Sequence, residues 1–327
     1  MAITSAIDLP RDQFAHAGAP KEWWWHTGTL RCGNRLFGFE VTATGHFDQD
    51  FQFTEIMITD VQARRHFQKT TGAAPFDPKW AQSDPALPWY VRLCGPLGAN
   101  GAVSMQAPVG DPFSMSVAAS FEDEASGLPC MLNLLMKQND LPLLVWGTGV
   151  REVYKDKPPL QANNYYYSFT KLHAVGTLQI GAESFDVEGL TWMDHEYGAF
   201  PTGTQWVLQD MQLDNGVHIS NYFSSIQPVE NQATPSNATI LWPDGKCTFV
   251  STVTTPIAPT WTNAAAKTYC LRMRVDIAEL NASFLVTSLV PDQEFAAGPV
   301  YEGVAHAVGS FDGKAVSGTA WLEQSIG

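Results

Sequence analysis

The sequence predicts an all-β protein, and three observations support this prediction. Runs rich in Val, Thr, Phe, Trp and Tyr recur between clusters of Gly, Pro, Asn and Asp, at the roughly 8–12-residue spacing of sandwiches and barrels. No segment sustains the periodicity of a long amphipathic helix. The pattern Val-x-Gly-x-x-Trp-x-acid occurs twice, at 187–194 and 316–323, which indicates two related sheets.

The first half of the chain contains a closely spaced series of strand candidates. Segments 21–30 and 35–44 flank Gly33-Asn34, a dipeptide typical of a hairpin turn. Four prolines between residues 72 and 90 exclude regular structure there and predict a long loop. Further strand candidates are 51–59, 103–107, 113–121, 131–137, 143–150, 165–172, 176–180 and 187–198.

The pattern restarts beyond Gly198, which places a domain boundary near residue 200. We therefore expect one domain over residues 1–200 and a second over residues 201–327. A short helix is allowed over 263–274. The strand candidates of this half are 204–213, 217–225, 239–242, 247–254, 271–275, 284–289 and 316–325.

Composition excludes several classes of partner. Lys+Arg 19 against Asp+Glu 33 gives a formal charge of −14, whereas nucleic acids and anionic membrane surfaces need basic patches. Five cysteines without a C-x-x-C pair predict reduced thiols rather than a zinc site or a disulfide framework. The N-terminus lacks the regions of a signal peptide, and no apolar run is long enough for a membrane-spanning helix. We expect a cytoplasmic protein.

The strand 187–198 carries the densest chemistry. Period-two alternation places Trp192, Asp194 and Glu196 on one face and His195 on the other. In a cavity lined by Trp192, Tyr165, Tyr167 and the tryptophans of 23–25, burial would favour the neutral form of Asp194. A shift of about three pKa units costs roughly 4 kcal/mol. Asp194 would then serve as a general acid; alternatively, it accepts backbone N–H bonds at a strand end and the tryptophans only pack.

Other candidate residues lie on neighbouring strands. Glu22, Trp24 and His26 would share one strand face, where Glu22 and Trp24 are candidates for substrate binding. His26 would polarise a substrate or orient Asp194, or would be a hydrogen-bonded core histidine. Tyr165 and Tyr167 also share a face, where they would bind a ligand or pack.

Metal and cofactor motifs are absent from the sequence. His195 points away from Asp194 and Glu196 on a strand, so the three cannot share an ion. We therefore expect no metal, and His195 and Glu196 remain candidates for substrate binding. The chain has no P-loop, no G-x-S-x-G and no H-E-x-x-H, and we expect no cofactor.

Several segments together resemble the lipocalin-like family of carotenoid 1,2-hydratases (hydroxyneurosporene synthases) and AttH proteins. They are Glu-Trp-Trp-Trp-His-Thr-Gly at 22–28, Tyr-Tyr-Tyr-Ser at 165–168, Trp-Met-Asp-His-Glu at 192–196 and Gly-Thr-Ala-Trp-Leu-Glu at 318–323. The resemblance implies two lipocalin-like (calycin-type) antiparallel β-barrels in tandem, without cofactor or metal. It also implies that Asp194 is the proton-donating acid and that Trp192 is its aromatic partner.

One departure from that family concerns the substrate. Where the carotenoid hydratases have a His and an aromatic residue two positions later, this chain has Tyr165 and Tyr167. The missing His favours a different small apolar or aromatic substrate.

Three functions follow as hypotheses. The first is a cofactor-independent hydratase or dehydratase, a lyase in which Asp194 protonates an unsaturated molecule, Trp192 stabilises positive charge, and Tyr165, Tyr167 and His26 bind or orient the substrate. The second is a cyclase or isomerase of the pericyclase type in a natural-product pathway. The third is a small-ligand carrier without chemistry. Incorporation of solvent oxygen marks hydration, and a product of equal mass marks cyclisation.

Overall fold

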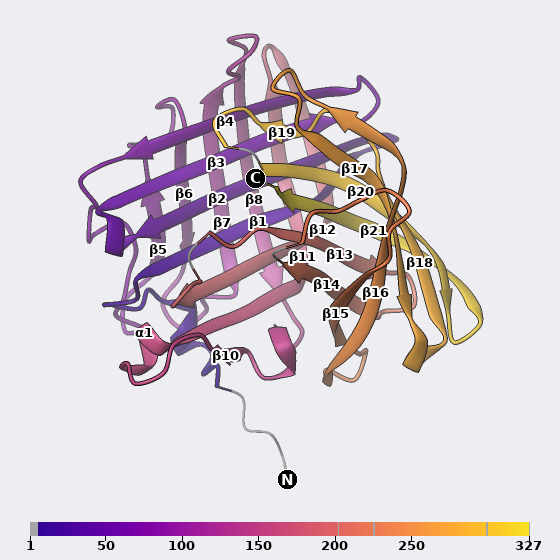
Figure 1. Ribbon diagram of the computed structural model, residues 1–327. Helices are drawn as coiled ribbons and strands as arrows, with labels where there is room; N and C mark the ends of the chain where they lie inside the picture. Colours follow the sequence, from indigo (N-terminus) through magenta and orange to yellow (C-terminus); the bar gives the residue numbers. More distant parts are fainter. Residues whose placement is uncertain (1–5, 202, 225, 299, 327) are drawn as a thin grey trace.

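Two antiparallel sheets make up almost all of the protein, as a computed structural model shows (Figure 1). The structure describes residues 6–201, 203–224, 226–298 and 300–326. The first five residues of the expected domain 1–200, the last residue of the expected domain 201–327 and the last residue of the expected strand 217–225 lie outside this description. The described helices are all single turns: η1 (Arg11–Gln13), η2 (Phe47–Gln49), η3 (Val145–Gly147), α1 (Pro159–Ala162) and η4 (Ala278–Leu280). The all-β prediction is confirmed.

The first sheet is an open, curled half-barrel. Its strands follow the order β4-β3-β2-β1-β12-β11-β8-β7-β6-β5, and the short β9 and β10 pair with β11. The strands are β1 (Lys21–Cys32), β2 (Arg35–His46), β3 (Phe51–Asp60), β4 (Arg65–Ala73), β5 (Trp89–Leu93), β6 (Ala102–Ala107), β7 (Ser114–Glu122), β8 (Pro129–Gln138), β9 (Leu143–Leu144), β10 (Val150–Glu152), β11 (Asn163–Ile180) and β12 (Glu183–Gly198).

The second sheet closes into a barrel. Its order is β18-β17-β16-β15-β14-β13-β21-β20-β19, and the additional pairing of β18 with β20 joins eight of these strands into a ring. The strands are β13 (Trp206–Leu213), β14 (His218–Ser224), β15 (Thr234–Leu241), β16 (Cys247–Thr262), β17 (Thr268–Ile277), β18 (Ala282–Ser288), β19 (Glu294–Phe295), β20 (Val300–Phe311) and β21 (Lys314–Ser325).

The repeated sequence pattern occupies the same place in both sheets. Strand β12 lies between β11 and β1, and β21 lies between β20 and β13, so each is the last long strand of its sheet paired with the first. A Cβ on Gly189 would lie 2.0 Å from the carbonyl oxygen of Thr29, and one on Gly318 would lie 2.1 Å from that of Gln212. Both copies therefore need glycine because the backbone of the neighbouring strand passes too close for a side chain.

Alternation along each strand separates two apolar interiors from the seam between the sheets. Trp24 and Met193 point into the core of the half-barrel, and Met211 and Leu322 point into the core of the closed barrel. The alternate residues of the same strands face the other sheet, where Trp321, Val304 and Met57 form a smaller cluster across the seam. Side chains from both sheets also line a cavity in this seam.

The expected helix over 263–274 is wrong. Residues from Thr268 onward form β17, and Thr268 pairs with Thr262 of β16 across a tight turn. The side-chain amide oxygen of Asn263 accepts the backbone N–H groups of Ala265 and Lys267 and so stabilises this turn. Tyr269, Leu271, Met273 and Val275 then alternate into the barrel core, and this period of two outweighs any local helical preference.

Two other expectations are confirmed. The Gly33-Asn34 turn joins β1 to β2, with Cys32 opposite Arg35. The proline-rich segment between β4 and β5 has no strand of its own in the structure. In the described part of the chain, no helix has the length and apolar character needed to cross a membrane.

The seam packs tightly at Gly38, and this contact generates a prediction. A Cβ on Gly38 of β2 would lie 2.6 Å from Cβ of Val304 on β20. We expect Gly38→Ala to lower the free energy of unfolding by about 1–3 kcal/mol because of overpacking. Urea denaturation measures the effect. The double variant Gly38→Ala/Val304→Gly removes the clashing Cβ of Val304 and should lose less than the sum of the two single variants, and additive losses would contradict the contact.

Candidate active site

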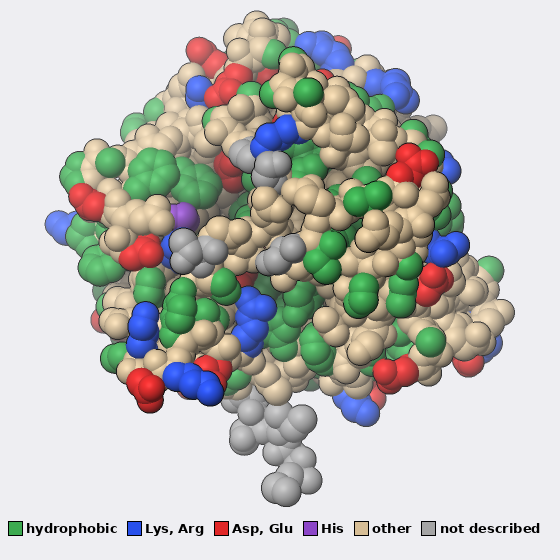
Figure 2. All heavy atoms as spheres, viewed as in Figure 1, with side chains coloured by type: hydrophobic (Ala, Val, Ile, Leu, Met, Phe, Trp, Pro, Cys, Tyr) green, Lys and Arg blue, Asp and Glu red, His purple; other side chains and the backbone are tan. Residues whose placement is uncertain are grey.

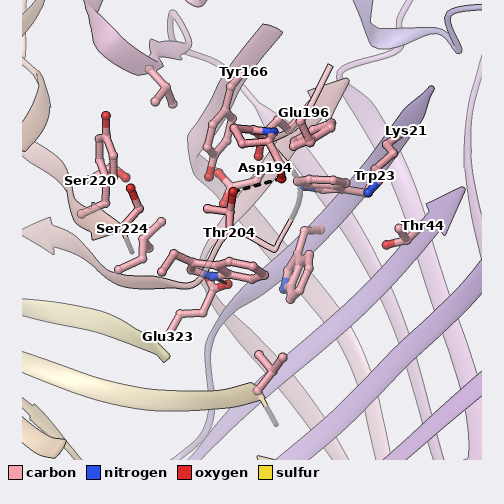
Figure 3. Close-up of a pocket in the computed structure, with 18 of the residues that line it drawn as sticks. Lys21, Trp23, Thr44, Tyr166, Asp194, Glu196, Thr204, Ser220, Ser224 and Glu323 are labelled. Carbon is pink, nitrogen blue, oxygen red and sulfur yellow. Dashed lines mark hydrogen bonds between the residues drawn. The ribbon is translucent and has the colours of Figure 1, made fainter. Parts of the chain in front are cut away.

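A cavity of about 370 Å³ lies between the two sheets (Figure 3). In the half-barrel its walls come from β1, β2, β3, β10, β11 and β12, and in the closed barrel from β13, β14, β20 and β21, together with η3 and the segment after β12. Figure 2 shows a hollow on this side of the molecule, with hydrophobic side chains around it and acidic side chains at its edge and depth. Aromatic rings dominate the walls: Trp23, Trp25, Trp146, Tyr166, Trp206 and Tyr222.

Asp194 faces this cavity from β12. Its Oδ1 accepts a hydrogen bond from the Ser168 hydroxyl at 2.5 Å and another from the Trp192 indole N–H at 2.6 Å. Among the described residues no Lys, Arg or His forms an ion pair with it. Burial raises the pKa of Asp194 to about 6, although the hydrogen bonds from Ser168 and Trp192 act in the opposite direction. The carboxyl group therefore retains a proton in part of the molecules near neutral pH.

Three more carboxyl groups line the same cavity: those of Glu55, Glu196 and Glu323. Burial, with the nearby charge of Glu323, raises the pKa of Glu55 to about 8. Burial also raises the pKa of Glu196 to about 8, against the opposing charge of Arg151. The pKa of Glu323 rises to about 7 for the same reason, and its carboxylate accepts the indole N–H of Trp206. Near neutral pH the cavity thus holds two mainly protonated acids, Glu55 and Glu196, together with Glu323 and Asp194, which titrate close to that pH.

The acids continue from the cavity along the seam. Glu40 on β2, Glu302 on β20 and Asp210 on β13 are buried, and burial raises the pKa of each well above its ordinary value. The Trp321 indole N–H donates to Glu302 at 2.6 Å. Both repeated tryptophans therefore donate to a buried carboxyl group, Trp192 within its own strand and Trp321 across to β20.

The structure separates Asp194 from most of its expected partners. In the registers of β12 with β11 and β1, Ser168 and Trp25 lie opposite Asp194, whereas Tyr167 and Trp24 lie opposite His195. The expected cavity shared by Asp194, Tyr165 and Tyr167 is therefore wrong, because the two tyrosines lie on the other face of the sheet. His26, Trp24, Glu22 and His195 lie on that face too, and the cavity-facing candidates are Asp194 and Glu196.

Trp192 lies behind Asp194 rather than in the cavity wall. Its ring is buried with Leu143, Val145 and Leu241, and its N–H ends on the carboxylate. This placement suits a positioning residue. The aromatic side chains of these strands that do line the cavity are Tyr166 of β11 and Trp23 and Trp25 of β1 (Figure 3).

The opposite face carries a closed hydrogen-bond network that includes the N-terminal segment. Oε1 of Glu22 lies 2.8 Å from Nδ1 of His16 and 3.0 Å from Nε2 of His195. The second nitrogen of His16 lies 3.3 Å from Asp12, and that of His195 lies 3.0 Å from the Tyr167 hydroxyl. Burial opposes ionisation of Glu22, but the charge and hydrogen bonds of His16 and His195 outweigh it and lower its pKa to about 2.

This network also contains the residues that could hold a metal ion. One donor atom each from His16, Glu22 and His195 lie within 4.8 Å of one another. Each of these donors already has a hydrogen-bond partner in the network. The adjacent Asp194, His195 and Glu196 do not converge, as the alternation predicted.

His26 stands apart from both groups. It is fully buried opposite Met193, and neither ring nitrogen has a hydrogen-bond partner in the described residues. Burial lowers its pKa to about 3, so the ring is neutral. It cannot orient Asp194, since the two side chains lie on opposite faces of the sheet.

Sequence reasoning missed several residues of the cavity. Ser168 and Tyr166 alternate along β11 with Tyr165 and Tyr167, so they point to the other face of the sheet. Only the register of β11 on β12 shows that this is the face of Asp194. Glu323 was marked by the sequence repeat, but its approach to Asp194 needs both sheets. No sequence motif marked Arg151 or Trp146 as cavity residues. Trp146 has a left-handed backbone with φ 61°, which is uncommon for a bulky residue.

The fold and this cavity define a class of protein, a pair of lipocalin-like sheets with buried acids between them. The chain belongs to the AttH-like family, whose model matches residues 2–325. A comparison with curated proteins finds no match.

Three solved structures share the fold. An AttH protein from Nitrosomonas europaea has a TM-score of 0.74 at 19% identity, with 98% of this chain and 96% of that chain covered. Kievitone hydratase from Nectria haematococca has a TM-score of 0.75 at 17% identity, with 99% and 94% covered. CghA has a TM-score of 0.59 at 11% identity, with 99% and 94% covered. At these identities the likeness concerns the fold.

The protonated carboxyl groups predict an unusual pH dependence of stability. A carboxyl whose pKa is higher in the folded than in the unfolded protein contributes stability that is lost as the pH rises through the folded value. Glu55 and Glu196 have folded pKa values of about 8, so the free energy of unfolding should fall as the pH rises from 6.5 to 8. The buried His26 titrates below this window, since its pKa falls from 6.5 to about 3.

We expect Glu55→Gln to flatten this loss by about 1.4 kcal/mol per pH unit, the value for one proton. Denaturant unfolding at several pH values measures the slope. The exposed Glu188 of β12 provides a control, and Glu188→Gln should leave the slope unchanged. Stability of the wild type that rises across this window would contradict the protonated state of the seam.

Proposed function

We propose that this protein is a cofactor-independent lyase that adds water to, or removes it from, an unsaturated and mainly apolar small molecule. The observation that carries the proposal is the state of Asp194, a buried carboxyl group without a cationic partner that faces an aromatic cavity. A carboxyl with a pKa of about 6 is a suitable general acid near neutral pH. The shared fold of kievitone hydratase supports this reaction class.

The chemistry follows from the cavity walls. In hydration, the Asp194 proton would add to one carbon of a C=C bond, and positive charge would develop on the other carbon. The faces of Trp23, Trp25 and Tyr166 would stabilise that charge, each by about 0.5–2 kcal/mol. Water would then form the C–O bond and lose a proton, and dehydration is the same sequence reversed.

A base for the attacking water is also present. Hydration consumes one proton and releases another, so a carboxylate near Asp194 can receive the released proton. Glu323 suits this task because it lines the same cavity from the other sheet. With a pKa of about 7 against about 6 for Asp194, the active arrangement, in which Asp194 is protonated and Glu323 is ionised, is the minor one near neutral pH. The Trp206 N–H holds that carboxylate in place. Asp194 and Glu323 would thus act as acid and base.

A direct test uses a panel of ring-containing alkenes incubated with the protein in ¹⁸O-labelled water. We expect mass spectrometry to show the gain of one labelled water molecule in a member of the panel. The neutral isostere Asp194→Asn should lower that rate by about 10²–10⁴, the contribution of a general acid. Glu188→Gln on the same strand should retain the full rate. Full turnover by Asp194→Asn would rule out the acid.

The hydrogen bond from Trp192 generates a further prediction. Because its N–H stabilises the carboxylate form, Trp192→Phe should raise the pKa of Asp194 above about 6. The same direction is expected for Ser168→Ala. Carboxyl ¹³C NMR titration of protein with labelled aspartate measures the shift, and Asp194→Asn assigns the signal. A pKa that falls or stays unchanged in Trp192→Phe would contradict the positioning role.

A cyclase or isomerase is the second candidate, favoured by one observation. The cavity has aromatic walls from both sheets, and such walls could hold a flexible polyene in one folded shape. Protonation by Asp194 without capture of water would then give a product of unchanged mass. Absence of ¹⁸O from an isomeric product would favour this reaction, and binding without any product would favour a ligand carrier.

A further inference from the structure

Two cationic side chains project into a cavity that is otherwise aromatic and acidic. Lys21 enters from β1, where it lies beside Trp23 in Figure 3, and Arg151 enters from β10. Neither forms an ion pair within 4.0 Å with an acidic side chain of the described residues. The chain has a formal charge of −14 and only 19 Lys and Arg in total. Two cations without an ion-pair partner in one cavity are therefore unusual in so acidic a chain.

Arg151 is held in place rather than left mobile in solvent. Its guanidinium carbon lies 4.7 Å from the ring centroid of Trp146, a cation–π distance. Trp146 is itself fixed from the second sheet, since its indole N–H donates to the Tyr222 hydroxyl at 2.9 Å and its backbone N–H donates to the Thr239 hydroxyl at 3.0 Å. The left-handed backbone of Trp146 is a strain of the kind that persists where surrounding contacts enforce it.

The neighbouring acids do not cancel these positive charges. Glu196 is the carboxyl that feels the charge of Arg151, yet burial keeps its pKa at about 8. Glu55 has the same protonated state near neutral pH. Near Arg151 and Lys21 the cavity therefore presents two positive charges beside two carboxyl groups that are mainly neutral, so a negatively charged oxygen would gain attraction there without repulsion from Glu55 and Glu196.

We propose that the substrate is an apolar, ring-containing molecule with one anionic oxygen group, which Arg151 and Lys21 bind. The aromatic walls accept the apolar part, and the planar guanidinium pairs with a carboxylate or an ionised enol or phenol. This inference rests on the proposed function, since it takes the cavity as the substrate site. It adds the direction of binding: the charged end lies at Arg151 and the unsaturated end lies toward Asp194.

The test compares two probes of the same shape, 2-naphthoate and the neutral 2-naphthamide, by isothermal titration calorimetry at pH 7. We expect the wild type to bind the naphthoate about tenfold more tightly than the amide. Arg151→Gln should lose most of this preference while its affinity for the amide stays unchanged. Arg151→Lys should retain part of it, because a cation remains. Lys21→Gln should give a smaller loss.

Matched controls separate this role from a general effect of charge. Arg65 also lies over an aromatic ring, 4.6 Å from Phe67, but outside the cavity, and Arg65→Gln should keep the full preference. Circular dichroism checks that each variant retains its β-sheet spectrum. Equal affinity for the two probes in the wild type, no binding of naphthoate, or equal losses in Arg151→Gln and Arg65→Gln would each overturn the proposal.

The two proposals fail separately. Asp194→Asn should bind naphthoate at least as tightly as the wild type at pH 7, since it keeps both cations and removes a carboxylate that is ionised in most molecules at this pH. If the protein hydrates a neutral alkene but shows no preference for naphthoate, the general-acid proposal stands and the anion-site proposal is wrong. If the protein prefers naphthoate but turns over no member of the alkene panel, the anion-site proposal stands and the general-acid proposal is wrong.

Discussion

The seam between the two sheets is lined by buried carboxyl groups whose pKa values burial raises. Asp194, Glu55 and Glu196 from the half-barrel meet Glu323, Glu302 and Asp210 from the closed barrel, with few cations among them. Ionisation of several buried acids at once would set like charges against one another in a region of low dielectric. Neutral carboxyl groups avoid that cost, and they are also the form that donates a proton. The constraint that joins the halves is therefore the one that supplies acid chemistry.

The central strands β1, β11 and β12 serve two sites through their two faces. One face carries Asp194 and its donors Ser168 and Trp192. The other carries the network in which Glu22 joins His16 to His195. Because His195 follows Asp194 directly in the chain, the network fixes the backbone on which the acid stands. The rigid face behind the cavity provides the preorganisation that a proton donor needs.

The sequence was sufficient for the fold class and for the faces of single strands. Three local signals have their counterpart in the structure: the Gly33-Asn34 turn, the alternation of Asp194 with His195, and the repeated glycines Gly189 and Gly318. The partners of Asp194 were beyond reach, because the register of β11 on β12 decides whether Ser168 or Tyr167 lies opposite the acid. A shift of one residue exchanges the two faces.

Residues supplied by the second sheet were the hardest to foresee. Trp206 and Tyr222 reach the cavity only because two sheets pack outer face to outer face. Arg151 depends on the strained Trp146, which in turn depends on Thr239 and Tyr222. Nothing in the local sequence encodes such a chain of contacts, since each link joins segments far apart in the chain. The resemblance implied two β-barrel domains in tandem, and the sequence did not show that the first is an open half-barrel while the second closes.

The matching positions of Asp194 and Glu323 bear on ancestry. Duplication of one ancestral sheet would account for two glycine-containing strands with the same neighbours, and it would make the two acids descendants of a single residue. A symmetric ancestor would have offered two identical acids to one cleft, with no distinction between donor and acceptor of the proton. The shorter Asp194 with two donors and the longer Glu323 with one show how divergence of paralogous halves can turn a symmetric pair into two specialised groups.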